Sequence, residues 1–164
     1  MISSNPVTGR ERRHSDGRAM DALVAFYSAF NARDIEALRV NWSDGVDALL
    51  PSMSNPIGGL RRGWSEIGQG YAALFESRAR ISVEFHDYTH QEVGDVAVFA
   101  GRERGACVTS DTRLELAIRT TRIFVQIGGV WRQLHHHGSF ENGELLSAYQ
   151  RAVLSDRPRK LLHA

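Results

Sequence analysis

The feature that most constrains this chain is a change in the spacing of its apolar residues near Arg80. Beyond that point apolar and polar residues tend to alternate, in segments of strand length that cover residues 81–91, 95–108, 113–127 and 130–139. Between these segments stand short stretches with the Gly or Asp that tight turns favour. Consecutive strands joined by tight turns run antiparallel, so the second half of the chain predicts a four-stranded meander.

The first 80 residues show helical spacing instead. An apolar stripe predicts a first helix from Met20, Asp34 stands in the N-cap position of a second, short helix, and a third is expected around Tyr71. Between the second and third helices, residues 46–50 predict a short strand, followed by a loop rich in Ser, Asn, Pro and Gly. A last amphipathic stretch, 145–152, indicates a C-terminal helix.

Composition limits what such a chain can be. Its 164 residues are the usual size of one domain, 42% of them are hydrophobic, and no apolar run approaches the roughly 18 residues of a membrane span. The N-terminus lacks the apolar core of a secretory signal, so we expect a soluble cytoplasmic protein without a membrane partner. The single cysteine, Cys107, allows no internal disulfide and is interpreted as a small buried hydrophobe.

Charge is distributed unevenly along the chain. The formal net charge is only +1, and the positive excess lies at the two ends. We therefore expect a flexible basic N-terminal tail over 1–18, a folded domain over 19–140, and a C-terminal helix with a basic tail over 141–164. The basic tails carry no interleaved aromatic residues for base stacking, which argues against a nucleic-acid partner.

Two motifs carry a resemblance to a known family. The first is N-x-x-D between the first two helices, and the second is a last strand of the form G-x-W-x-x-x-H-x-H-x-S; their residues are Asn31, Asp34, Gly129, Trp131, His135, His137 and Ser139. With the order of predicted elements, they make residues 19–140 resemble the nuclear transport factor 2-like superfamily, and within it the SnoaL-like group. That group includes ketosteroid isomerase, polyketide cyclases and the association domain of calcium/calmodulin-dependent kinase.

The resemblance implies an α+β fold known as a cystatin-like roll. In it, a curved mixed or antiparallel sheet forms a cone-shaped half-barrel around three N-terminal helices and encloses a small-molecule pocket. It implies no particular reaction, because one fold of this kind carries many chemistries. A half-barrel also leaves a broad outer sheet face, so a homodimer is expected.

Side chains alternate along the last strand, which separates its three consecutive histidines. Alternation places Gln133 with His135 and His137 on one face and His136 on the other. By resemblance to the kinase association domain, the first face is the outer one, with Trp131, His135 and His137 at a subunit interface, and His136 points inward. No third ligand in register is evident for the His135/His137 pair, so no metal site is expected.

Arg122 interrupts an otherwise apolar inner stretch and lies where the resemblance places a pocket arginine. A buried arginine needs an anion. Two readings remain open: an internal ion pair with Glu103, or a ligand-directed role in which Arg122 clamps a carboxylate or enolate oxygen while His136 exchanges a proton. The apolar walls of the pocket are expected from Phe26, Phe30, Trp42, Met53 and Trp64.

Comparison with ketosteroid isomerase argues against that enzyme's own mechanism. The position of its oxyanion-binding tyrosine falls on Phe26, with Tyr27 one residue away and about 100° round the helix. The position of its catalytic base falls on Leu50 or Asn55, neither of which is a carboxylate.

Two functions from different classes therefore remain. One is an isomerase, cyclase or dehydratase that acts on a small carbonyl- or carboxylate-bearing substrate through Arg122 and His136, without a cofactor. The other is a non-catalytic ligand-binding or oligomer-assembly module, in which the same groups form a structural network.

Overall fold

The computed structural model describes residues 2–3, 5–14, 17–43 and 49–154. Its helices are α1 (Ala19–Ala32), α2 (Ile35–Asn41), α3 (Gly63–Glu76) and α4 (Gly143–Leu154). Its strands are β1 (Ser52–Ser54), β2 (Leu60–Arg62), β3 (Arg80–Val93), β4 (Val96–Val108), β5 (Arg113–Ile127) and β6 (Val130–Phe140). None of the described helices is long and apolar enough to cross a membrane.

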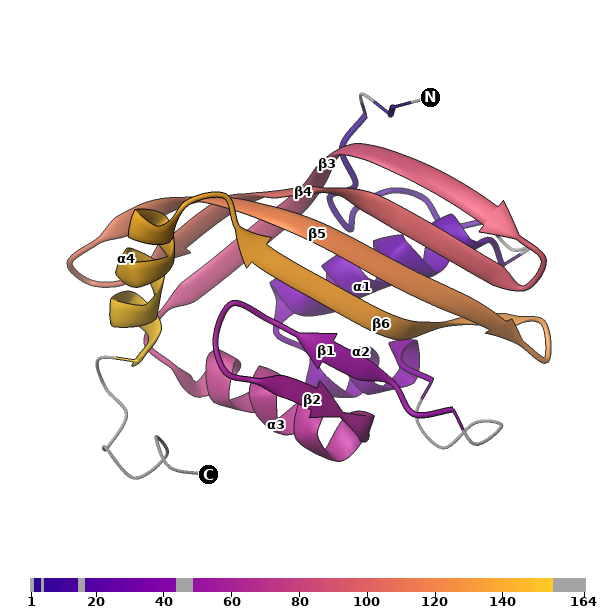
Figure 1. Ribbon diagram of the computed structural model, residues 1–164, viewed down its shortest axis with the longest axis horizontal. Coiled ribbons are helices and arrows are strands. Elements are labelled where there is room, and N and C mark those ends of the chain that lie inside the picture. The colour runs from indigo at the N-terminus through magenta and orange to yellow at the C-terminus, as the bar shows by residue number, and fades with distance from the viewer. Residues whose placement is uncertain (1, 4, 15–16, 44–48, 155–164) are drawn as a thin grey trace.

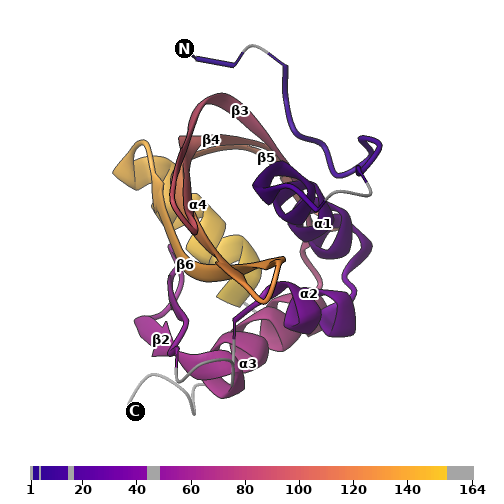
Figure 2. The ribbon, with the colours of Figure 1, turned by 90° about the vertical axis from the view of Figure 1, so that its right-hand side faces the viewer.

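The strands form one mixed sheet in the order β2-β1-β6-β5-β4-β3. All neighbouring pairs are antiparallel except β1 and β6, which run parallel. The long strands β3 to β6 are the predicted meander, and the sheet curves without closing (Figure 1). Figure 2 shows α1 on the concave side of this arch, with α2 and α3 nearby. The predicted α+β half-barrel on N-terminal helices is therefore confirmed.

The core lies between the concave face of the sheet and the helices. From α1 it receives the predicted stripe, since Leu23, Phe26, Tyr27 and Phe30 are each at most 8% exposed. Phe85, Phe99 and Phe124 meet this stripe from the sheet, all fully buried. Burial of so much aromatic surface is the main force holding α1 against the sheet.

The N-x-x-D motif has a structural explanation. Asn31, near the end of α1, donates from Nδ2 to the carbonyl of Val83 and accepts the Val83 N–H at its Oδ1, both at 3.0 Å. Asp34 caps α2 as predicted, because its carboxylate accepts the Ala37 N–H at 2.9 Å. The motif thus fastens α1 to β3 and starts α2.

Two local expectations differ from the structure. Of the strand predicted at 46–50, residues 46–48 lie outside the described residues, and residues 49–50 form no strand. Strand β1 begins later, at Ser52, because continuous pairing with the edge of β6 begins there. The N-terminal segment, expected as a flexible tail, makes defined contacts. Val7 is buried, and it and Phe85 exchange two backbone hydrogen bonds of 2.9 Å.

Candidate functional site

Arg122 on β5 is 1% exposed, and its charge is matched inside the protein. The guanidinium Nη2 lies 2.8 Å from Oε1 of Glu103 on β4, which is itself buried. A charge this deep in the fold is tolerated only where an opposite charge and hydrogen bonds compensate for its loss of water. Of the two readings left open by the sequence, the structure therefore has the internal Glu103–Arg122 pair.

The other two nitrogens of Arg122 are also engaged. Its Nε donates to the Tyr27 hydroxyl at 3.2 Å, and its Nη1 donates to Oε1 of Gln133 at 2.9 Å. The Tyr27 hydroxyl donates in turn to Glu103 at 2.9 Å, and the guanidinium carbon lies 3.5 Å from the centroid of the Phe26 ring. Burial opposes the charge, but Tyr27 and Glu103 outweigh it and hold the pKa of Arg122 above its ordinary value.

The alternation predicted for the last strand is wrong at Gln133. Ile123 pairs with His135 and Phe124 pairs with Gln133, so Leu134 is an extra residue in β6. Such a β-bulge shifts the faces of the strand by one residue. Gln133 and His136 therefore both point inward, whereas simple alternation had placed Gln133 on the outer face.

A cavity of about 50 Å³ lies beside this network. Its lining residues come from α1, α3, α4, the sheet and the segment after β1, and they are Phe26, Phe30, Asn55, Pro56, Tyr71, Leu74, Ile81, Val83, Glu103, Leu116, Ile118, Arg122, His136, Gly138 and Tyr149. The walls are mainly apolar, with a few polar groups. A space of this size has room for only a few heavy atoms.

Three polar side chains in the cavity wall have buried atoms without a hydrogen-bond partner. They are Asn55 through Oδ1, Tyr71 through its hydroxyl, and His136 through both ring nitrogens. A buried polar atom left unpaired costs about 1–3 kcal/mol, and nearly all such atoms in native proteins find partners. Their gathering around one cavity marks it as the place where a ligand would complete them.

Both titratable groups among these three are held neutral. Burial first, and the nearby Arg122 charge second, keep the pKa of His136 well below its ordinary value. Burial raises the pKa of Tyr71 against the opposing effect of the nearby Arg122 guanidinium, which interacts with this hydroxyl, and Tyr71 therefore remains a hydroxyl. The cavity thus offers one hydroxyl donor and a neutral imidazole, which has one donor and one acceptor nitrogen.

The predicted pocket residues divide into two sets. Phe26, Phe30, Glu103, Arg122 and His136 line the cavity, as expected. The other three predicted walls are not among its lining residues: Trp42 is buried beside Gln133, Met53 is buried in β1 in register with His136, and Trp64 is half-buried on α3.

The residues predicted at a subunit interface also lie in different places. His135 points outward, and its Nδ1 is 2.8 Å from the Ser52 hydroxyl. His137 is exposed. Trp131 lies on the helix side of the sheet, where it lines a groove with residues of α1, because the bulge at Leu134 separates its face from that of His135.

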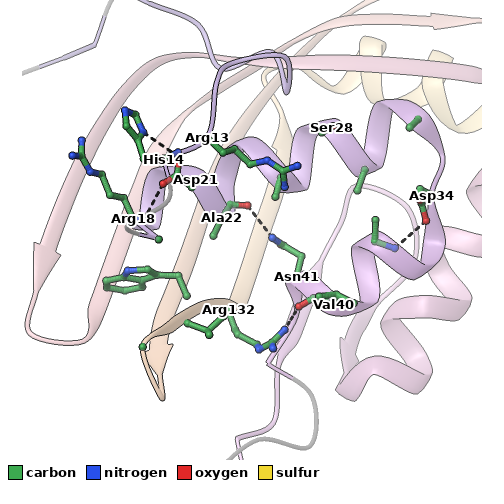
Figure 3. Close-up of a pocket in the computed structure, with 18 residues that line it drawn as sticks. Arg13, His14, Arg18, Asp21, Ala22, Ser28, Asp34, Val40, Asn41 and Arg132 are labelled. Carbon is green, nitrogen blue, oxygen red and sulfur yellow. Dashed lines mark hydrogen bonds and ion pairs between the residues drawn. The ribbon is translucent and has the colours of Figure 1, made fainter.

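That groove, of about 710 Å³, runs between α1, α2 and the β5–β6 turn (Figure 3). Its polar side chains hold neighbouring backbone. Asp21 accepts the N–H groups of His14 and Arg18 at 2.9 and 3.0 Å, Asn41 donates to the carbonyl of Ala22, and Arg132 donates to that of Val40. Among the described residues that line the groove, only Asn41 Oδ1 is buried without a hydrogen-bond partner, whereas four such atoms gather around the smaller cavity, which is therefore the better candidate for the functional site.

Three polar residues of the cavity wall were not predicted as pocket residues: Tyr71, Tyr149 and Asn55, the last noted only as a possible position of the isomerase base. Tyr27, which completes the Arg122 network, was noted only as a departure from the isomerase pattern. The sequence does contain a signal for Tyr71 and Tyr149. Each lies on the apolar stripe of a predicted helix, where a buried tyrosine needs a hydrogen-bond partner for its hydroxyl. Across the described ranges, no three His, Cys, Asp or Glu side chains are placed to share a metal ion.

Comparisons with known proteins agree with this architecture. A proposed dehydratase of the NTF2-like family from Streptomyces avermitilis is 25% identical, with a TM-score of 0.67 over 74% of this chain and 92% of that one. A ketosteroid isomerase-like protein from Erwinia carotovora is 18% identical, with a TM-score of 0.64 over 76% and 95% of the two chains.

A proposed calcium/calmodulin-dependent protein kinase type II association domain from Thiobacillus denitrificans is 20% identical, with a TM-score of 0.60 over 79% of this chain and 100% of that one. At such low identity, these likenesses speak to the fold alone. Comparison with curated proteins finds no match. The model of the SnoaL-like domain matches residues 19–142, and the chain therefore belongs to the SnoaL-like family.

Proposed function

We propose that this protein binds a small, uncharged carbonyl compound in the cavity beside His136, and that His136 exchanges a proton with it. The observation that carries the proposal is the set of unpartnered polar atoms on Asn55, Tyr71 and His136 around one largely apolar space. Apolar pockets with a few convergent polar groups and a perturbed pKa are the usual setting of a ligand site, but they usually measure several hundred Å³, so this cavity of about 50 Å³ admits only a very small ligand. The similarity to a proposed dehydratase is in keeping with this chemistry.

The charge balance of the cavity selects an uncharged ligand. Glu103 already neutralises Arg122, and the Nε, Nη1 and Nη2 atoms of Arg122 each have a partner within the protein. A carboxylate entering the cavity would add a buried negative charge without a free cation to match it, at a cost of several kcal/mol. We therefore assign recognition to Tyr71 and His136 rather than to an Arg122 clamp.

Each polar group has a role that its chemistry allows. The Tyr71 hydroxyl can donate to a carbonyl oxygen and stabilise the enol form as negative charge develops there. The neutral imidazole of His136 can accept a proton from the carbon beside the carbonyl and return it to another position, although the burial and the Arg122 charge that lower its pKa also make it a weak base. This is proton transfer of the isomerase type, and it needs no cofactor.

Deuterium exchange into 2-butanone tests the proposal. In D₂O, wild type should speed exchange of the protons beside the carbonyl, and His136→Phe and Tyr71→Phe should each lose about 100-fold of that acceleration or more. His137→Phe, on the exposed neighbouring residue, is the control and should match wild type. Equal exchange in wild type and His136→Phe would refute proton transfer by His136.

The second function, a non-catalytic binding or assembly module, is favoured by one observation. The Glu103–Arg122 pair is closed and the cavity is small, as expected where the charged groups stabilise the fold. Binding of 2-butanone without any exchange would select this alternative.

We also propose a homodimer. Val98, Ile123 and Val125 are half-buried neighbours on the outer sheet face, beside Val96, which is 40% exposed. Sedimentation at micromolar concentration should show a dimer; monomer alone would contradict it.

A further inference from the structure

Helix α4 lies just outside the residues that the SnoaL-like family model matches. It spans Gly143–Leu154, immediately after residues 19–142, which the family model matches. It lies at the end of the sheet where β6 ends and where β4 turns into β5 (Figure 1). Asn142 begins the helix by accepting the Leu145 N–H at 2.8 Å.

Helix α4 closes one wall of the cavity. Tyr149 of α4 is 7% exposed and lines the cavity together with His136 and Arg122. Its ring packs against Phe140, with the ring centroids 4.9 Å apart. The ligand site of the proposed function is therefore bounded by a side chain from outside the matched domain.

A second hollow, also of about 50 Å³, lies on the other side of this wall. It is lined by Ile57, Arg61, Gly70 and Val153, which do not line the cavity. Four residues line both spaces: Asn55, Pro56, Leu74 and Tyr149. These four residues thus form the boundary between the cavity, with Tyr71 and His136, and the second hollow, which is called the outer chamber below; Asn55 of the proposed site is part of this boundary.

Tyr149 is the member of this boundary best placed to move. Leu74 belongs to α3, and Asn55 and Pro56 directly follow β1, which is paired on both edges. Helix α4, in contrast, buries only two of its twelve residues, Tyr149 and Val153. Elements with few buried side chains open at lower free-energy cost than the core.

We propose that Tyr149 is a specificity-determining gate between the outer chamber and the cavity. With its ring in place, the cavity takes only a few heavy atoms; with the ring displaced or removed, the two spaces join and a larger ligand reaches His136. The proposal rests on the proposed function, since it assumes that ligands meet His136 and Tyr71.

Chemical modification of His136 tests the gate without any need to know the ligand. Diethyl pyrocarbonate acylates neutral imidazoles, and exposed His137 gives an internal reference rate within the same peptide. We expect Tyr149→Ala to speed modification of His136, relative to His137, about tenfold. In Tyr149→Phe, which keeps the ring, His136 should be modified at the wild-type rate.

Leu146→Ala is the matched control, because Leu146 is a half-buried apolar residue of the same helix and lines neither space. Equal His136 rates in wild type and Tyr149→Ala would overturn the gate. So would an equal acceleration in Leu146→Ala, since general loosening of α4 would then account for both.

A second test compares deuterium exchange into a larger and a smaller ketone. In the deuterium-exchange assay, Tyr149→Ala should gain about tenfold with cyclohexanone and change little with 2-butanone. If Tyr149→Ala exposes His136 to the reagent but no variant exchanges deuterium into a ketone, the gate stands and the proposed proton transfer fails. If exchange depends on His136 while the reagent reaches it equally in every variant, the gate fails alone.

Discussion

Arg122 and Glu103 stabilise the protein only as a pair. Each is buried, and each would be an uncompensated charge in the absence of the other. We expect Arg122→Met to lower the free energy of unfolding by about 3–5 kcal/mol, and the double variant Glu103→Gln with Arg122→Met to recover most of that loss. Urea unfolding measures both; a double variant as unstable as the sum of its single changes would show that the two side chains do not interact.

His136 makes stability depend on pH. Its folded-state pKa is depressed, so below about pH 6.5 the unfolded chain binds a proton at this position that the folded chain does not. Stability should therefore fall as the pH falls, by up to about 1.4 kcal/mol per pH unit from this group.

The variant His136→Phe cannot bind that proton, so comparing it with wild type isolates the contribution of His136 to the pH dependence of stability. Relative to wild type, the variant should gain stability between pH 6.5 and 5, as measured by urea unfolding at each pH. The pKa of His135 is also lowered, by burial and by its neighbour His137, but this group is present in both proteins and cancels. Parallel pH profiles for the two proteins would mean that His136 is not held neutral.

At the scale of single residues, the positions of buried charged side chains could be predicted from the sequence better than those of buried neutral polar side chains. Arg122 stands out as a charge within an apolar stretch, and the family resemblance placed Glu103 at a polar pocket position, so a pair could be anticipated. Gln133 could not be placed, because the bulge at Leu134 depends on how β5 and β6 pair. Asn55 could not be placed either, since its position is set by a loop that no periodic pattern describes.

Among the elements, the N-terminal segment is the least expected. Gly9 has φ = 85°, and a Cβ there would lie 2.4 Å from the backbone nitrogen of Ser28 on α1. The segment is held further by Glu11, whose carboxylate accepts the N–H groups of Thr8 and Gly9 at 2.6 and 2.9 Å. Close backbone packing of this kind admits only glycine.

Gly9→Ala should therefore detach the segment from the sheet. We expect the amide of Phe85, which donates to the Val7 carbonyl, to exchange with solvent about tenfold faster. Gly94→Ala is the control, because Gly94 has a similar positive φ of 57° with no atom within 4 Å of the added Cβ. Equal protection of Phe85 in wild type and Gly9→Ala would contradict the close approach.

Elements with strong periodicity were predicted well. The strands of the meander could be predicted from their alternating apolar residues, because shifting a strand by one residue would expose its whole buried face. The apolar stripe of α1 could be predicted from its helical spacing. The short strands β1 and β2, of three residues each, have no such period. Their positions follow from pairing with β6 and with each other, which only the folded molecule shows.

At the scale of the whole molecule, the curved sheet and the helices surround one small, mainly apolar space. Four groups of elements contribute to its wall: α1, α3, the sheet with the segment after β1, and helix α4. Within it, charge is balanced by Glu103 and Arg122, which leaves neutral groups to meet a ligand. The central claim is that this cavity recognises an uncharged molecule through Tyr71 and His136.

The most direct test compares 2-butanone with propionate, two ligands of nearly equal size that differ in charge. NMR titration of wild type at neutral pH should show the His136 ring signals shifting with 2-butanone and unchanged with propionate at the same concentration. A response to propionate that equals or exceeds the response to 2-butanone would contradict the account, because it would mean that Arg122 is available to an anion despite its pairing with Glu103.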